Sequence, residues 1–162
     1  MKIVLNLFLM LTTISCSADT NDSLSNDEVD NVASNEEMAS IVSVASSGTE
    51  NNYTFSVGIS SPDTGCSQYA NWWEVVKEDG TLLYRRILGH SHVNEQPFVR
   101  SGGTIDIPSD QVVIVRAHMN TSGYGIKAFI GSVSGGFKET ILENGFAENL
   151  ATVAPQPDKC AF

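Results

Sequence analysis

The stretch Tyr53-Thr54-Phe55-Ser56-Val57-Gly58-Ile59-Ser60 alternates apolar residues with polar or small ones. A period of two places all the apolar side chains on one face of an extended strand. One face of this strand is therefore expected to pack in a core, and the opposite face to meet solvent.

The sequence on the C-terminal side continues in β-type runs. Asp79-Gly80 separates two such runs, and this dipeptide favours a two-residue hairpin turn because its residues tolerate positive φ. The turn sets a register in which Trp73 faces Arg86 across the hairpin. Residues 97–103 are expected to form a long connecting loop. Strands are expected at residues 41–45, 71–78, 81–88, 104–107, 111–119 and 124–133.

The last part of the chain allows two interpretations. Residues 137–143 and 146–153 flank Asn144-Gly145, which predicts a second hairpin. Residues 139–150 also contain good helix formers, so a helix is the alternative.

Short strands at regular spacing, without a convincing helix, predict an all-β fold. We expect an antiparallel β-sandwich of immunoglobulin or fibronectin type, formed by residues 39–162 as a single domain. A small jelly roll or barrel is the runner-up.

The N-terminal segment has the pattern of an export signal. Lys2 supplies one positive charge, and residues 3–11 form an apolar run that is too short for a stable transmembrane anchor. The following Thr12-Thr13-Ile14-Ser15-Cys16 resembles the lipobox of bacterial lipoproteins, with Thr13 where that family usually has leucine. The resemblance implies that residues 1–15 are removed as a signal peptide, and that Cys16 carries a membrane-inserted lipid.

Cysteine usage is consistent with this resemblance. The chain has three cysteines, and an odd number leaves one over in an exported protein. If Cys16 carries lipid, Cys66 and Cys160 remain, and this pair can form a disulfide in an oxidising compartment. A free nucleophilic thiol is the alternative, although no histidine lies near Cys66 or Cys160 in the sequence.

The net charge of −10 belongs mainly to residues 17–50, which contain eight acidic residues and no lysine or arginine. A segment this polar cannot bury enough apolar surface to fold, so residues 16–38 are expected to form a disordered acidic tether. Acidic residues soon after a lipidated cysteine resemble the surface-export signal of some Gram-negative lipoproteins. That resemblance implies an outer-membrane or cell-surface location in a bacterium. The chain has no basic patch, which argues against nucleic acid as a partner.

The three histidines form a candidate metal site. His90 and His92 are two residues apart, so on a strand they point to the same side, and His118 from another strand could provide a third ligand for zinc or copper. Glu95 is a candidate fourth ligand or general base. Two alternatives stay open: the histidines are polar surface residues, or an intervening strand of an immunoglobulin-type sheet keeps them too far apart for one ion.

A candidate ligand face follows from the alternation of side chains. Val113, Val115, Ala117 and Met119 are expected in the core, so Arg116 and His118 point the other way. Trp72 and Trp73 are adjacent, and one of them must be buried. One outward face could then collect Trp73, Tyr84, Arg86, His90, His92, Arg116 and His118. Such a face suits a glycan, a small molecule or a protein.

Three functions follow from these observations. The first is a membrane-anchored lipoprotein whose sandwich binds a ligand or partner without turnover. The second is a zinc- or copper-binding protein or hydrolase that uses the three histidines. The third is a structural or adhesive spacer.

Overall fold

The computed structural model describes residues 37–161. The predicted signal peptide, Cys16 and all but the last two residues of the predicted tether lie outside the described residues. Between residues 37 and 161 there is no helix of the length and apolarity needed to cross a bilayer.

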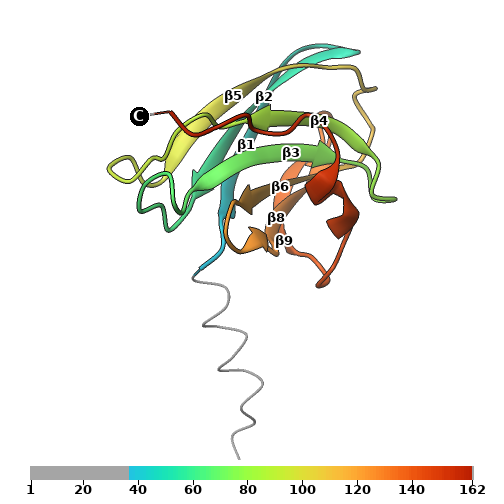
Figure 1. Ribbon diagram of the computed structural model, residues 1–162. Helices are drawn as coiled ribbons and strands as arrows, with labels where there is room; N and C mark the ends of the chain where they lie inside the picture. Colours follow the sequence, from blue (N-terminus) through green and yellow to red (C-terminus); the bar gives the residue numbers. More distant parts are fainter. Residues whose placement is uncertain (1–36, 162) are drawn as a thin grey trace, which may run out of the picture.

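The described chain is built from nine strands and one short 3-10 helix, η1, and Figure 1 shows the strands stacked in two layers. The elements are β1 (Ser40–Thr49), β2 (Asn52–Ser60), β3 (Ala70–Val76), β4 (Leu82–Ile87), β5 (Phe98–Ile105), β6 (Val113–Met119), β7 (Gly123–Tyr124), β8 (Lys127–Ser132), β9 (Gly136–Ile141) and η1 (Glu148–Thr152).

The two layers are antiparallel sheets that do not close into a barrel. The smaller sheet has the order β1-β2-β5, and the larger has the order β4-β3-β6-β8-β9, with β7 paired to β6. The sheet β1-β2-β5 thus packs against a sheet in which β3 lies between β4 and β6. Immunoglobulin-type sandwiches have the same arrangement. The predicted β-sandwich is confirmed, and β9 extends its larger sheet.

The main core lies between the sheets and follows the predicted alternation. In β2, Phe55, Val57 and Ile59 are fully buried and Tyr53 nearly so. The predicted core face of β6, which consists of Val113, Val115, Ala117 and Met119, is also fully buried. A period-two pattern therefore identified the inner faces of both sheets.

The predicted register of the first hairpin is correct away from the turn. Trp73 lies opposite Arg86, and Glu74 lies opposite Arg85. Near the turn the register shifts between Val75 and Val76, and the Lys77 N–H donates to the Thr81 carbonyl. The loop therefore has three residues instead of two, because a bulge accompanies the turn.

The predicted loop at residues 97–103 is wrong, because most of it belongs to β5. Gly102 lies inside this strand for a packing reason. A Cβ atom at Gly102 would lie 2.6 Å from side-chain atoms of both Trp73 and Tyr84. Two glycines that suggested a loop are therefore part of a strand, and at Gly102 the missing side chain leaves room for two aromatic rings.

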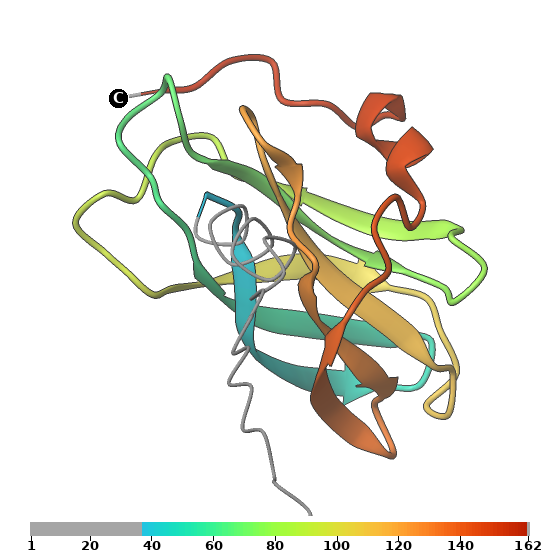
Figure 2. The same cartoon turned by 90° about the horizontal axis from the view of Figure 1, so that it is seen from below.

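The C-terminal hairpin is half correct. Residues 137–143 largely coincide with β9, but residues 146–153 form a turn and η1 instead of a second strand. This C-terminal segment crosses the outer side of the larger sheet and returns toward the loop that contains Cys66 (Figure 2). It covers a second, smaller apolar cluster, in which Leu150 packs with Val76, Ile114 and Ala128.

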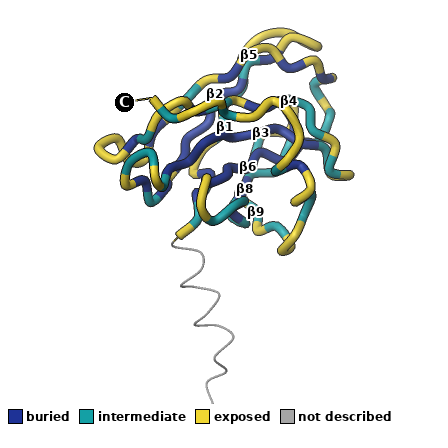
Figure 3. Tube along the Cα trace, viewed as in Figure 1, coloured by how far each residue is buried: buried dark blue, intermediate teal, exposed yellow. Residues whose placement is uncertain are grey.

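Burial on both faces explains why β3 and β6 are buried throughout (Figure 3). Their inner faces meet the smaller sheet, and their outer faces lie under the C-terminal segment. Successive strands from β1 to β5 run in alternating directions. Loops 61–69 and 88–97 therefore lie at the end of the sandwich where β1 begins (Figure 1). The turns at residues 49–52 and 77–81 lie at the opposite end.

Candidate functional site

The predicted common ligand face is wrong, because its members lie on opposite sides of the larger sheet. In the pairing of β3 with β6, Trp73 lies opposite Ala117, whereas Trp72 lies opposite His118 and Glu74 opposite Arg116. Residues that face each other across a strand pair share a side. Trp73 therefore belongs to the core side, together with Tyr84 and Arg86, while Arg116 and His118 point to the outer side.

The three histidines do not form the predicted three-histidine site. His90 and His92 lie in the loop after β4, with ring centroids 4.5 Å apart, whereas His118 lies on β6 with its ring stacked on Trp72 at 3.7 Å. The order β4-β3-β6 places a strand between the two groups. Within residues 37–161, no three histidine, cysteine, aspartate or glutamate side chains are arranged to hold one metal ion.

Glu95, the predicted fourth ligand, forms an ion pair instead. Its Oε2 lies 2.7 Å from Nη2 of Arg100, and its Oε1 accepts a second hydrogen bond from the same guanidinium. These hydrogen bonds lower the pKa of Glu95 below its ordinary value. The carboxylate is thereby bound to β5, which carries Arg100, and it is itself largely exposed to solvent.

The outer side of the larger sheet carries a buried ionic cluster. Glu74 accepts hydrogen bonds from Nε of Arg85 at 2.8 Å and from Nε of Arg116 at 2.9 Å. The three side chains are no more than 1% exposed. Two guanidinium groups share one carboxylate, so the cluster has one positive charge in excess. Charges this deeply buried need further partners.

Those partners are main-chain carbonyls of the C-terminal segment. Arg85 donates to the carbonyls of residues 150, 153 and 155, and Arg116 donates to those of residues 146 and 147. Five carbonyl oxygens thus surround the excess charge. We call Arg85 and Arg116, together with Glu74, the arginine clamp. Arg116, which was predicted to contact a ligand, therefore holds the chain's own C-terminal segment together with Arg85.

His118 and Tyr124 complete this buried layer. The Asn71 Oδ1 accepts a hydrogen bond from Nδ1 of His118 at 2.8 Å, which leaves Nε2 unprotonated in the neutral ring. Burial, and then the charges of Arg85 and Arg116, lower the pKa of His118 from 6.5 to about 3. Burial raises the pKa of Tyr124 to about 12. Both rings therefore stay neutral at ordinary pH.

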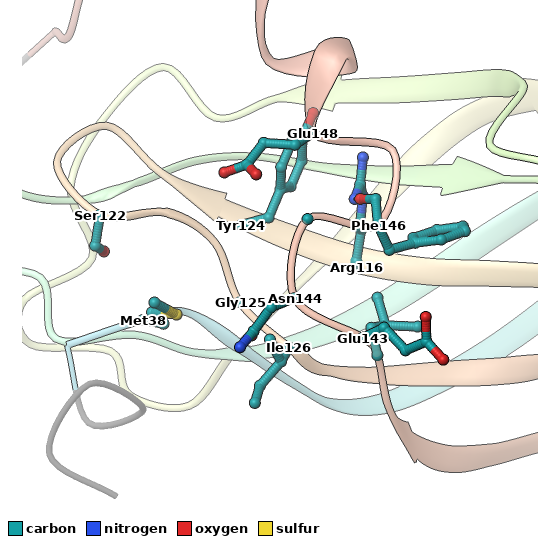
Figure 4. A pocket seen from close by; sticks show the side chains of 12 residues that line it. Met38, Arg116, Ser122, Tyr124, Gly125, Ile126, Glu143, Asn144, Phe146 and Glu148 are labelled. Atoms are coloured by element: carbon teal, nitrogen blue, oxygen red, sulfur yellow. The ribbon is translucent and has the colours of Figure 1, made fainter. Parts of the chain in front are cut away.

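A hollow of about 320 Å³ lies beside the clamp, between the start of β1 and the turn after β9 (Figure 4). Arg116 and Tyr124 line it, together with Met38, Glu143 and Glu148. The guanidinium of Arg116 stacks 3.5 Å from the Tyr124 ring centroid, and its Nε, Nη1 and Nη2 all donate to Glu74 or to main-chain carbonyls. The guanidinium that lines this hollow is therefore already engaged within the protein.

A second hollow has polar groups without partners. It measures about 390 Å³ and lies at the end where β1 begins; we call it the histidine hollow. It is lined by Gly65, His90, Ser91, His92, Val93, Asn94, Glu95 and Ala161. His92 is the unusual member. Its side chain is 1% exposed, yet neither ring nitrogen has a hydrogen-bond partner within the described chain.

Asp63 fixes the loop that carries these histidines. Its Oδ1 accepts from the Ala70 N–H at 2.9 Å and from the Ser61 hydroxyl at 2.7 Å, while its Oδ2 accepts from the His92 N–H at 2.7 Å. The His92 ring stacks on Phe98 with centroids 3.8 Å apart. Burial, followed by the charges of Arg100 and His90, lowers the pKa of His92.

The functional role of Asp63 was missed in the sequence, where it stands in a Ser-Pro-Asp-Thr-Gly turn motif. The turn itself was visible, but the bonds from Asp63 to β3 and to the loop after β4 join segments far apart in the chain. The hairpin register could have placed Glu74 opposite Arg85, but it gave no signal for the third member of the clamp, Arg116, or for the carbonyls that the clamp binds.

The remaining cysteines form the predicted disulfide. Cys66 and Cys160 are bonded, with Cα atoms 5.6 Å apart and a sequence separation of 94. The bond joins the loop after β2 to the end of the C-terminal segment, next to the histidine hollow.

Comparison with known proteins gives one informative relative. A protein of Halomicrobium mukohataei described as "Putative lipoprotein" is 38% identical over 90 residues, which cover 55% of this chain and 44% of the relative. The matched part thus spans less than half the length of that relative. No protein-family model matches the chain, and no solved structure is significantly similar to it.

Proposed function

We propose that this chain is an exported protein anchored to a membrane through lipid on Cys16, and that its β-sandwich is a binding module. The observation that carries the anchor is the disulfide. Cys66 and Cys160 are bonded to each other, so Cys16 is the one cysteine of the three that remains for lipid. The lipobox-like sequence before Cys16 and the similarity to a protein described as a lipoprotein support the same proposal.

The anchor is tested by changing Cys16 to alanine. We expect the wild-type protein to partition into the detergent phase after extraction of membranes, and Cys16→Ala to stay in the aqueous phase. Ser17→Ala is the matched control and should partition like the wild type. Equal partitioning of wild type and Cys16→Ala would exclude a lipid on this residue.

The binding module would use the histidine hollow. This hollow combines a buried imidazole without hydrogen-bond partners, an exposed second imidazole at His90 and the exposed apolar side chain of Val93. A concave surface with one exposed imidazole favours a polar ligand that bonds to His90, and the buried nitrogens of His92 would add hydrogen bonds once they are uncovered. The ligand class would be a small polar molecule or a glycan with hydroxyl groups.

The hollow lies at the end of the sandwich from which the predicted tether continues. Twenty residues separate Cys16 from Glu37, and such a chain spans at most about 70 Å when fully extended. That length is sufficient to hold the hollow clear of a membrane surface and to let soluble ligands reach it.

The binding role is tested by screening the lipidated protein in detergent against glycan and small polar molecule libraries. We expect a ligand whose affinity falls at least about tenfold in His90→Ala, equivalent to about 1.4 kcal/mol. Lys138→Ala, an exposed change on β9, is the control and should bind like the wild type. A ligand that binds equally to His90→Ala would place the binding site elsewhere.

A further inference from the structure

The disulfide stands at the wall of the histidine hollow. Two of the residues that line the hollow, Gly65 and Ala161, are each the chain neighbour of a bonded cysteine. The Ala161 N–H also donates to the Gly89 carbonyl at 2.6 Å, at the start of the histidine-bearing loop. The wall contributed by Ala161 is thus attached by one covalent bond and one hydrogen bond.

The C-terminal segment is attached at two separate places. The arginine clamp holds the carbonyls of residues 146–155, and the disulfide with the Ala161 hydrogen bond holds residues 160–161. Within the described chain, no hydrogen bond or ion pair connects residues 157–159 to the sandwich, and 158 and 159 are exposed. The two attachments share no residue and no hydrogen bond.

We propose that the disulfide is a redox latch on the histidine hollow. Reduction frees residues 156–161, removes the Ala161 wall and admits solvent to the imidazole of His92, while the arginine clamp keeps residues 146–155 in place. This inference rests on the proposed binding role of the hollow for its biological meaning, because opening the wall would change access of a ligand to His92.

The chemistry requires an external dithiol, either a small molecule or an oxidoreductase. One thiolate of the dithiol attacks the sulfur of Cys66 or Cys160, forms a mixed disulfide and expels the other cysteine as a thiolate. The second thiol of the reductant then displaces the bound cysteine. Two electrons and two protons pass to the protein, and the dithiol becomes a disulfide. Both cysteines are partly exposed, and their chain neighbours Gly65 and Ala161 line the hollow.

The three histidines provide an internal test of this latch. Diethyl pyrocarbonate acylates accessible neutral imidazoles, and peptide mapping by mass spectrometry gives the rate at each histidine. His90 is exposed, His92 is buried at the hollow, and His118 is buried under the clamped segment. Full-length protein in detergent is compared before and after treatment with dithiothreitol, with the free thiols then blocked. The double variant Cys66→Ser/Cys160→Ser is measured in parallel.

We expect the acylation rate of His92 to rise at least about tenfold on reduction, which corresponds to about 1.4 kcal/mol in the local opening equilibrium. The rates at His90 and His118 should stay within about twofold of the oxidised protein. Ala161→Pro keeps the disulfide but removes the N–H that donates a hydrogen bond to the Gly89 carbonyl. Its acylation rate at His92 should lie between those of the oxidised and the reduced wild type.

An unchanged rate at His92 in both the reduced protein and the double-serine variant would overturn the latch. A parallel rise at His118 would also overturn it, because the clamp would then have failed together with the disulfide. Neither readout requires a ligand. Failure to find any ligand would therefore reject the proposed binding role without affecting the acylation result.

Discussion

The stability of this protein should fall as pH is lowered, and His118 should contribute much of the loss. The folded protein holds this ring neutral, with a pKa of about 3, whereas the unfolded chain has the ordinary value of 6.5. Below pH 6.5 the unfolded state therefore binds a proton that the folded state does not. The contribution of His118 is complete above pH 6.5 and is lost as pH falls toward 3.

The magnitude follows from these two values. At pH 5 the protonated imidazole exceeds the neutral one about 30-fold in the unfolded chain, while the imidazole of the folded protein is still neutral. The free energy of unfolding is therefore about 2 kcal/mol lower at pH 5 than at pH 8. That loss is a large share of the roughly 5–15 kcal/mol by which domains are stable. In urea unfolding followed by tryptophan fluorescence, it would lower the midpoint by about 1 M.

The control is His118→Gln, which removes the titrating group and retains an amide that can bond to Asn71. This variant should lose about 2 kcal/mol less than the wild type between pH 8 and pH 5. A smaller slope should persist because the pKa of His92 is also lowered by burial. A wild type as stable at pH 5 as at pH 8, or a His118→Gln protein with the wild-type slope, would refute the buried neutral imidazole.

Three further changes test the packing that surrounds the site. Glu74→Gln leaves two buried guanidinium groups without their carboxylate and should reduce the free energy of unfolding by about 3–5 kcal/mol in urea titrations; a cost below about 1 kcal/mol would argue against a buried cluster. Gly102→Val places a side chain where a Cβ would already lie 2.6 Å from the Trp73 ring. We expect the free energy of unfolding to fall by about 1–3 kcal/mol and the tryptophan fluorescence spectrum to change. An unchanged spectrum would contradict this contact. Replacing Cys66 and Cys160 by serine should lower the free energy of unfolding by about 4–5 kcal/mol, because the disulfide closes a loop with a sequence separation of 94 and so restricts the unfolded chain. Equal thermal midpoints for the wild type and the double-serine variant would contradict the cross-link.

Local patterns predicted the sandwich well because they report on single strands. Alternation in Tyr53–Ile59 and in Val113–Met119 identified residues that are buried in the structure. The Asp79-Gly80 turn gave the pairing of Trp73 with Arg86, and the bulge near the turn did not alter it. These inferences needed only neighbouring residues or one tight turn.

The candidate ligand face failed because it required the relative side of residues on different strands. Adjacent Trp72 and Trp73 must point in opposite directions, and the sequence offers no reason to choose between them. The structure places Trp73 in the main core, and Trp72 on the outer side against His118. Both tryptophans are buried, since the C-terminal segment covers the side that was expected to face solvent.

The C-terminal segment was beyond sequence reasoning for a similar reason. The segment is held through its own main-chain carbonyls, which carry no sequence signature. The donors are the side chains of Arg85 and Arg116, which lie far away in the chain. The sequence suggested a ligand face with Arg86 and Arg116, whereas the residues that bind the segment are Arg85 and Arg116. Their role as a clamp depends on Glu74 between them and on the segment above.

The roles assigned to the three cysteines can be checked together by mass spectrometry. Mass spectrometry of the protein purified from membranes of its own cell should give an N-terminal peptide that begins at Cys16 with covalently attached lipid. The same sample, digested without reduction, should contain Cys66 and Cys160 in one disulfide-linked pair of peptides. An N-terminal peptide with unmodified Cys16, or a disulfide that includes Cys16, would contradict the proposed anchored binding module.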